Sequence, residues 1–304
     1  MNLSRLVALL ATALLVGCAG TRPAQKPFDL PAAPPGTLTV GLIVSSGTTT
    51  AQEQAEAMAK FVANATGQQA RPMVFPDYDT LATFMADGKV DVAFLAPMAY
   101  VRATALGKVQ PLLKVMRAGQ ATYRSVLFTG PAGTVRSLED LKKARELRAA
   151  WVDPSSATGY IFAKALLLQN DIDPAGIFKD QLFLQSHDAV CKAIAEGRAD
   201  VGASYSTDPA SAPVKSISGC NTLGAQAGKL QIVAATEAIP NDVLAVREAF
   251  PAEAKAALLA AAQELERTEE GKKTLATAFH GEGFTTVSDD DYAPVRAALL
   301  AFKR

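Results

Sequence analysis

The chain has 304 residues, with 30 basic and 30 acidic side chains and therefore no net formal charge at pH 7. This balance leaves no electrostatic field suited to nucleic acid, and no basic tract predicts binding to a membrane surface. With 49% hydrophobic residues the chain can build a core, and its length fits one or two domains of ordinary size.

The N-terminus has the pattern of an export signal. Arg5 is followed by an apolar stretch, 6–17, that is too short to span a bilayer. The run LVGC that ends at Cys18 resembles the bacterial lipobox, in which the cysteine is lipidated and becomes the first residue. We expect 1–17 to be a lipoprotein signal peptide, with a plain secretory signal as the alternative. The mature protein would lie outside the cytoplasm, on the periplasmic face or the outer surface, attached to the membrane only by the lipid on Cys18.

Residues 18–36 are rich in Ala and Pro, a composition that stays extended and cannot close a core. We expect this segment to be a tether. After removal of the signal, Cys191 and Cys220 are the cysteines left besides Cys18. In an oxidising compartment an even pair favours one disulfide, with two unrelated buried thiols as the alternative.

From Leu38 onward, apolar strand-like runs alternate with helix-like stretches. Ala55, Met58, Ala59 and Val62 follow the i, i+3, i+4, i+7 spacing of an amphipathic helix. The first part predicts strands at 38–44, 71–75 and 90–95 and helices at 50–66 and 78–86. The middle part predicts strands at 123–129, 147–152, 181–185 and 201–205, and helices starting after Ser137 and covering 158–169 and 188–196.

The last part of the chain is mostly helical, with a short strand at 243–247 before helices at 251–266, 268–279 and 289–302. Strands that alternate with helices indicate mostly parallel sheets flanked by helices. Two such α/β units followed by a helical tail fit two lobes, with the tail returning to cover the first lobe. Open sheets of this kind bind ligands beyond the carboxyl ends of their strands.

The sequence lacks the motifs of the common catalytic sites. It contains no Gly-x-Ser-x-Gly elbow, no phosphate-binding loop ending in Lys-Ser/Thr, no His-Glu-x-x-His and no Cys-x-x-Cys. Its two histidines exclude a His-rich metal site. We expect neither a metal nor a cofactor.

A Ser-rich turn, 153–160, follows the strand that ends at Val152. A helix that starts near Thr158 leaves its first amides unpaired at a positive dipole end, where the hydroxyls of Ser155 and Ser156 would add donors for a small oxyanion. Ordinary N-capping by Ser155 or Ser156 is the alternative.

Polar or aromatic residues also follow three other strands. His187 could donate a hydrogen bond to an anion, although Ser186 could instead cap a helix that leaves His187 merely exposed. Tyr100 and Tyr205, judged singly, are as compatible with packing as with ligand binding. His280, near a helix end, is interpreted as structural because a cation suits the C-terminal dipole.

Taken together, these segments resemble one family. The runs WVDPSSATGY (151–160), SHDAV (186–190), ADVGA (199–203) and IPND (239–242) occur in the order found in the phosphate, phosphite and phosphonate substrate-binding proteins of ABC importers. The segment DVAFLAP (91–97), followed by Tyr100, is similar to part of their first lobe. The resemblance covers about residues 38–250.

The family implies a type II periplasmic-binding fold, with two lobes that close on the ligand. By this likeness the first lobe is 37–120 plus 238–304 and the second is 121–237. The likeness implies that Ser155, Ser156 and Thr158 bind the oxyanion and that His187 is a further donor. It also implies that Tyr100 reaches across from the first lobe and that Tyr205 lines the wall of the second.

Three further points follow from the likeness. Asp242, in the IPND run, would shape the interlobe crossing rather than touch the ligand. Ala157 stands where the family usually has a hydroxyl, so one donor is missing and the exact oxyanion stays open. The first-lobe segment 45–50 is rich in hydroxyls where the family pattern is more charged.

The resemblance predicts a monomeric, lipid-anchored receptor that captures a small phosphorus oxyanion, such as a phosphonate, phosphite or phosphate, for an ABC-transporter permease. Two alternatives stay open. One is a hydrolase or transferase that uses Ser156 with His187 and Asp188, which requires the base within hydrogen-bond reach of the nucleophile. The other is a sensory or scaffold lipoprotein on the same fold.

Overall fold

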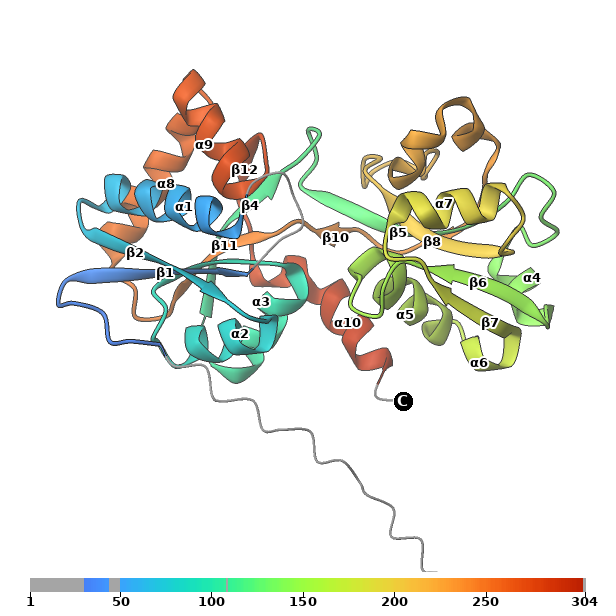
Figure 1. Cartoon of the computed structure of the whole chain (residues 1–304). Helices are drawn as coiled ribbons and strands as arrows, with labels where there is room; N and C mark the ends of the chain where they lie inside the picture. Colours follow the sequence, from blue (N-terminus) through green and yellow to red (C-terminus); the bar gives the residue numbers. More distant parts are fainter. Residues whose placement is uncertain (1–29, 44–49, 108, 303–304) are drawn as a thin grey trace, which may run out of the picture. The chain divides into compact units, whose positions relative to one another are not determined.

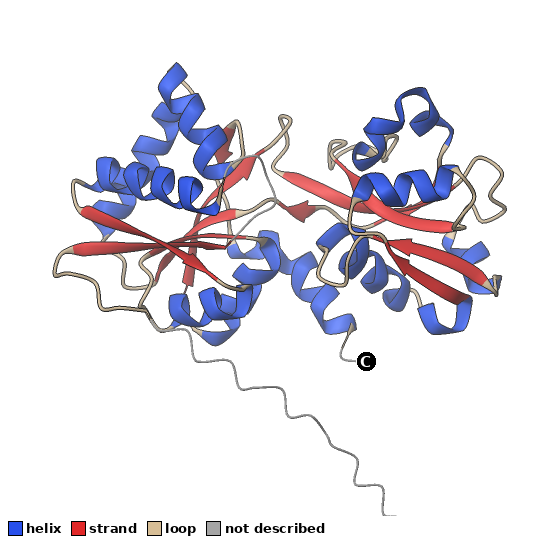
Figure 2. Ribbon diagram, viewed as in Figure 1, coloured by secondary structure: helices blue, strands red, loops and turns tan. Residues whose placement is uncertain are grey.

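Two six-stranded sheets, each flanked by helices, form the folded part of the chain (Figures 1 and 2). The computed structural model describes residues 30–43, 50–107 and 109–302. The expected signal peptide, Cys18 and most of the tether lie outside the described residues, as does 45–49 of the hydroxyl-rich segment.

The first sheet has the strand order β12-β4-β11-β3-β1-β2. Its strands are β1 (Thr37–Ile43), β2 (Gln69–Phe75), β3 (Val92–Leu95), β4 (Val109–Met116), β11 (Val243–Arg247) and β12 (Gly283–Thr285). The helices of the first lobe are α1 (Ala51–Thr66), α2 (Tyr78–Ala86), α3 (Pro97–Leu106), α8 (Ala252–Leu265) and α9 (Glu269–Phe279).

The second sheet has the order β10-β5-β8-β6-β7, with β9 paired to β5. Its strands are β5 (Thr122–Thr129), β6 (Leu147–Trp151), β7 (Phe178–Phe183), β8 (Val201–Ser206), β9 (Gln231–Ala235) and β10 (Ile239–Pro240). The helical segments are α4 (Leu138–Lys143), the π-helical turn η1 (Ala157–Ile161), α5 (Phe162–Gln169), α6 (Pro174–Ile177), α7 (His187–Ala195) and the 3-10 segment η2 (Ser218–Lys229).

Both sheets are mixed, whereas the alternation of strands and helices predicted mostly parallel sheets. Parallel pairing is confined to β1 with β2 and β3, and to β6 with β7 and β8. The antiparallel pairings involve β4, β5 and β9–β12. The reason is topological, because the chain leaves the first sheet after β4, enters the second at β5 and returns from β10 to β11. The two-lobed α/β fold itself is confirmed.

The core of the first lobe shows why the tail helices return to it. Leu258 of α8 and Phe279 of α9 are fully buried with Val40 of β1 and Met58 of α1 in one hydrophobic cluster. Thr50 caps α1 by accepting a hydrogen bond from the Glu53 amide at 3.2 Å, and a capping box completes this helix start. The expected cover of the first lobe by helical tail residues is therefore present.

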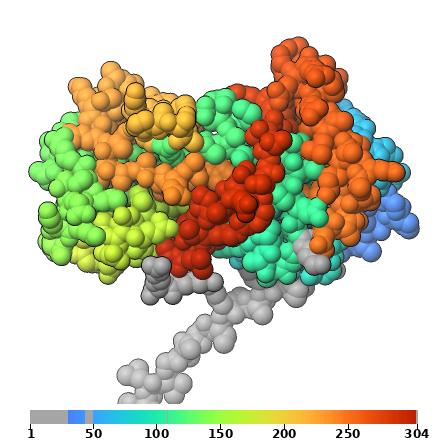
Figure 3. All heavy atoms as spheres, turned by 180° about the vertical axis from the view of Figure 1, so that it is seen from behind, coloured from blue at the N-terminus to red at the C-terminus, as the bar shows by residue number. Residues whose placement is uncertain are grey.

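The last helix differs from the other two tail helices. The 3-10 turn η3 (Asp289–Tyr292) leads into α10 (Ala293–Ala301), where one continuous helix, 289–302, was expected. This helix contacts α3 of the first lobe and α5 of the second. Figure 3 shows it in red on the surface, with segments of both lobes beside it.

The chain crosses between the two sheets twice. The first crossover is the turn between β4 and β5, where the Arg117 amide donates to the Gln120 carbonyl at 2.9 Å. The second lies between β10 and β11. Ile239 and Pro240, which the expected division assigns to the first lobe, pair with β5 of the second sheet.

Candidate functional site

The pairing of the second sheet brings two helix starts to one edge. β6 runs parallel to β7 and β8, so their carboxyl ends lie together. Beyond β6 the pairing continues, because the Gln185 amide donates to the Val152 carbonyl at 2.7 Å. The Ser-rich turn and Ser186, the N-cap of α7, therefore begin directly after two residues that are paired with each other, Val152 and Gln185.

The Ser-rich turn opens a π-helical turn rather than the expected α-helix from about Thr158. The Ile161 amide donates to the Ser156 carbonyl at 2.9 Å, five residues back. Ser156 is the N-cap, and its hydroxyl accepts from the Gly159 amide at 3.1 Å. Thr158 is 5% exposed, and its carbonyl accepts from the Ser125 hydroxyl of β5 at 2.6 Å. The widened turn is thus anchored to the sheet, and its first amides have no intrahelical carbonyl to bind.

Ser155 lies in the same turn but has a different partner. Its hydroxyl donates to the Asp153 carboxylate at 2.6 Å, and its amide donates to the same oxygen at 2.8 Å. These hydrogen bonds hold the pKa of Asp153 below its usual value, so the carboxylate is charged at neutral pH. The proton of Ser155 is therefore already engaged, whereas Ser156 accepts a hydrogen bond and keeps its own proton to donate.

His187 is held by two residues of β8. Its Nδ1 lies 2.9 Å from the Ser204 hydroxyl, and its ring packs edge-on against Tyr205 with centroids 4.9 Å apart. Burial lowers the pKa of His187, against a smaller raising effect from Asp188, so the imidazole is neutral at neutral pH. Ser204 precedes Tyr205 in the chain but was not among the site residues expected from the sequence.

A disulfide joins α7 to the 3-10 segment η2. Cys191 of α7 and Cys220 of η2 are bonded, with Cα atoms 5.4 Å apart. Next to the bridge, buried Gly219 packs so tightly that an added Cβ would overlap the hydroxyl of Ser204 and the ring of Tyr205. The η2 segment therefore packs directly against the residues that hold His187.

Tyr100 is fully buried in α3 of the first lobe. Its hydroxyl donates to Asp289 at 2.7 Å and its ring lies against Tyr292, with centroids 4.4 Å apart. Burial, followed by the effects of Asp289, raises the pKa of Tyr100. In this arrangement Tyr100 packs α3 against η3, and its contact with a ligand stays a prediction.

The first sheet has a polar edge of its own that the sequence analysis missed in part. Arg117 follows β4 and binds Asp242, with Nη2 2.6 Å from Oδ2. Its Nε also donates to the His280 carbonyl at 2.8 Å, at the end of α9. The helix dipole is thus complemented by Arg117 rather than by His280, whose pKa is lowered by burial and then by Arg117.

The hydrolase alternative requires Ser156, His187 and Asp188 in a chain of hydrogen bonds. In the structure His187 Nδ1 lies against Ser204, and the Asp188 carboxylate accepts from the Thr222 hydroxyl at 2.7 Å. The histidine and aspartate therefore have partners that do not form a catalytic relay.

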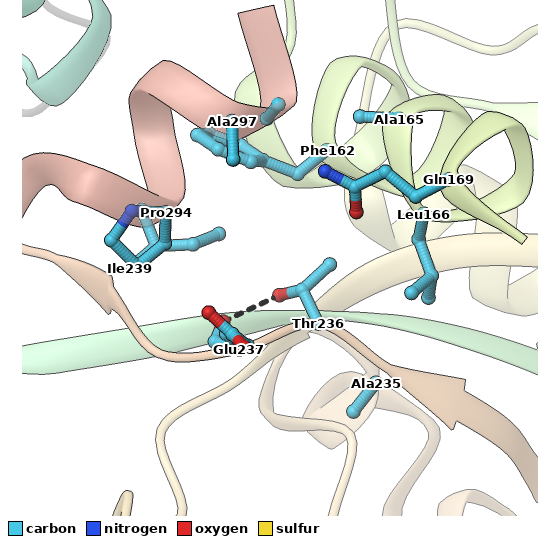
Figure 4. Close-up of a pocket in the computed structure, with 11 residues that line it drawn as sticks. Phe162, Ala165, Leu166, Gln169, Ala235, Thr236, Glu237, Ile239, Pro294 and Ala297 are labelled. Atoms are coloured by element: carbon cyan, nitrogen blue, oxygen red, sulfur yellow. Dashed lines mark hydrogen bonds between the residues drawn. The ribbon is translucent and has the colours of Figure 1, made fainter. Parts of the chain in front are cut away.

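A separate cavity of about 360 Å³ lies between α5, α10 and the segment that joins β9 to β10 (Figure 4). Its lining combines apolar side chains, such as Phe162 of α5 and Pro294 of α10, with the polar side chains of Gln169, Thr236 and Glu237. None of the ligand-binding residues expected from the sequence lines it. Within the described residues there is no cluster of metal-binding side chains, and no helix there is long and apolar enough to cross a membrane.

The fold and its polar strand ends define the class of two-lobed solute-binding proteins. A family model described as the periplasmic substrate-binding protein of phosphonate ABC transporters matches residues 40–292. The chain belongs to this family, which consists of extracytoplasmic transport proteins and not of enzymes.

Individual relatives agree with this assignment. The phosphate-import protein PhnD of Mycolicibacterium smegmatis is 30% identical over 215 residues, which make up 66% of this chain and 63% of that protein, less than two thirds of its length. A binding protein of a phosphonate ABC transporter from Pseudomonas aeruginosa is 25% identical, with a TM-score of 0.59 and coverage of 88% of this chain and 87% of that one. PhnD1 from Prochlorococcus marinus, solved with methylphosphonate, has the same fold, with a TM-score of 0.60 at 17% identity, covering 89% of this chain and 99% of that one.

Proposed function

We propose that this protein captures a small phosphorus oxyanion between its two lobes and delivers it to an ABC-transporter permease, while lipid on Cys18 holds it at the membrane surface. The observation that carries the proposal is the pair of helix starts, at Ser156 and Ser186, that follow adjacent strands of the second sheet. Unpaired amides and hydroxyls at such a place favour an anion. The import of phosphate by the mycobacterial relative and the methylphosphonate in the Prochlorococcus structure support a phosphorus oxyanion.

The proposed donors differ in whether they must break an existing hydrogen bond to bind the anion. Ser156, Thr158 and the first amides of η1 provide donors directly, and His187 adds one from α7. Ser155 reaches the anion only by releasing Asp153, so its contribution is reduced by the hydrogen bond that it loses. Tyr205 lines the wall beside His187. A hydrogen bond to a charged group contributes about 1.5–3 kcal/mol.

The experiment measures the dissociation constants of the purified soluble protein for phosphate, phosphite and methylphosphonate by calorimetry. We expect at least one to bind and Ser156→Ala to weaken it roughly tenfold to a hundredfold. Ser137→Ala is the matched control, because Ser137 caps α4 by accepting from the Asp140 amide at 3.1 Å, as Ser156 does from Gly159. Both variants lose a cap worth about 1 kcal/mol of stability, but only Ser156→Ala should lose affinity. Absence of binding to all three anions would overturn the proposal.

A further inference from the structure

We propose that Arg117 determines which substituent the ligand can carry. A small cavity of the first lobe, distinct from that in Figure 4, is lined by Arg117 and Asp242. By pairing with Asp242, Arg117 makes this cavity electrically neutral, so the site accepts phosphorus oxyanions with small uncharged groups and rejects those with an ammonium group. This inference rests on the proposed function, since it concerns the part of the same ligand that faces the first lobe.

The cavity lies where an open sheet receives a ligand. β1 and β3 are parallel, so their carboxyl ends at Ile43 and Leu95 share one edge of the first sheet. Asp242 precedes β11, which pairs antiparallel with β3 from Val243 opposite Leu95, and therefore lies at that edge. The Val115 amide of β4 donates to the Asp242 carbonyl at 3.0 Å. These residues bring Arg117 and Asp242 to the carboxyl edge, where ligands bind in such folds.

The cavity is small and holds one ion pair. Its volume is about 130 Å³. Leu42, Ile43, Gln54, Tyr78, Phe94, Ala96, Arg117, Asp242 and His280 line it. This space fits the hydrogen, hydroxyl or short alkyl group of a phosphite, phosphate or simple phosphonate.

The ion pair is fixed rather than adaptable. The Arg117 guanidinium binds Asp242 at 2.6 Å and donates to the carbonyls of Phe279 and His280 at 3.3 and 2.8 Å. The two charged side chains are only 33% and 23% exposed. A guanidinium that donates to three acceptors can move away only by breaking these hydrogen bonds.

The other titratable groups of the cavity are neutral near pH 7. Burial, and then the charge of Asp242, raises the pKa of Tyr78, so its phenol stays protonated. Burial, and then Arg117, lowers the pKa of His280, so its imidazole stays uncharged. The positive charge of Arg117 therefore cancels the negative charge of Asp242, and the described residues of the lining carry no third charge.

A ligand ammonium would find no free carboxylate among the lining residues that the structure describes. It would have to displace Arg117 from Asp242 or lie beside a guanidinium of the same sign, after losing its own hydration. An uncharged substituent meets neither cost. Selection against the ammonium is therefore a consequence of Arg117 and not of cavity size alone.

The test compares affinity ratios in wild type and Arg117→Gln, with methylphosphonate and 2-aminoethylphosphonate as probes. Wild type should prefer methylphosphonate. In Arg117→Gln the Asp242 carboxylate loses its ion-pair partner and can bind the ligand ammonium. The ratio of the two affinities should therefore shift toward 2-aminoethylphosphonate by roughly tenfold or more. Arg117→Lys, which retains the positive charge, should keep the wild-type preference. If Arg117 only stabilised the crossover, Arg117→Gln would lower the affinity for both ligands by the same factor and leave their ratio unchanged.

The reverse change provides an independent measurement. Asp242→Asn leaves Arg117 without its carboxylate, so affinity for phosphonoacetate relative to methylphosphonate should rise by a similar factor. Arg247→Gln is the control, because it removes another partly buried pair of the first lobe, Arg247 to Asp91 at 2.7 Å, at the far edge of β3. That variant should leave all ratios at the wild-type value.

The outcomes separate the two proposals. If methylphosphonate binds and neither Arg117→Gln nor Asp242→Asn shifts its ratio, the role of Arg117 is overturned while the proposed function stands. That role is also overturned if Arg247→Gln shifts the ratios by an equal factor. If wild type binds no phosphorus oxyanion, the proposed function itself fails.

Discussion

A hydroxyl can donate a hydrogen bond to an anion only if its proton is not already donated to another acceptor. The two serines of one short turn differ in this respect. Ser155 donates to Asp153, whereas Ser156 accepts from Gly159 and retains its proton. The sequence predicted that this turn carries donors, because serines before a helix provide them. It could not assign the donors, since the Asp153 carboxylate is brought to Ser155 only by the conformation of the turn.

Ala157→Ser should add a donor at the first residue of η1. We expect affinity for the bound oxyanion to rise about tenfold, because a hydrogen bond to a charged group contributes about 1.5 kcal/mol or more. Calorimetric titration with phosphate and methylphosphonate measures the change. Ala175→Ser, an exposed position in the first turn of α6, should leave the affinity unaltered. An equal or weaker affinity of Ala157→Ser would show that no anion reaches this turn.

His187 makes ligand affinity depend on pH. Burial lowers the pKa of His187 below its usual value of about 6.5, so protonation opposes folding in the free protein. The free energy of unfolding therefore decreases as the pH falls from about 6.5 toward the lowered pKa. A bound anion stabilises the imidazolium and raises the pKa, so a proton is taken up on binding. Affinity should therefore increase as the pH falls between the pKa of the complex and the lowered pKa of the free protein.

Comparison with His187→Gln isolates this effect, since the ligand and His280 titrate equally in both proteins. Dissociation constants measured from about pH 8 to about pH 5 should diverge, with the advantage of wild type growing toward acid pH. A ratio that does not vary with pH would place His187 out of reach of the anion.

At the scale of elements, the strongly patterned segments were predictable and the irregular ones were not. α2 and β11 have the expected bounds, because cap residues and apolar runs are local signals. β4 was missed because it contains Pro111 and Lys114, which oppose strand formation in a sequence. The fold tolerates Lys114 because Asp291, from a distant turn, binds its ammonium at 2.8 Å.

The packing of η2 against β8 gives a test of the second-lobe wall. Gly219→Ala should destabilise the protein by about 1–3 kcal/mol, because a Cβ would overlap Ser204 and Tyr205. Gly228→Ala is the matched control in the same segment, since an added Cβ there meets no atom within 4 Å. Urea unfolding measures both. Equal free energies of unfolding would mean that η2 does not press on the residues that hold His187.

For the whole molecule, attachment to the membrane should depend on Cys18. In cells that express the full chain, wild type should fractionate with membranes and Cys18→Ala with the soluble extracytoplasmic fraction. A lipid chain adds about 0.8 kcal/mol of membrane affinity per buried CH₂, so its loss should release the protein. Release of wild type into the soluble fraction would indicate a plain secretory signal instead.

The sequence by itself determined the family, the alternation of strands and helices, and the strand ends at which polar residues gather. These properties are local, since hydrophobic period, cap residues and short motifs are carried by neighbours in the chain. The tertiary structure decided the partners: Ser204 for His187, Asp289 for Tyr100, and Asp242 for Arg117. Such pairs join residues far apart in sequence, and whether a donor is free for a ligand or already bound depends on which distant strand or helix the fold brings beside it.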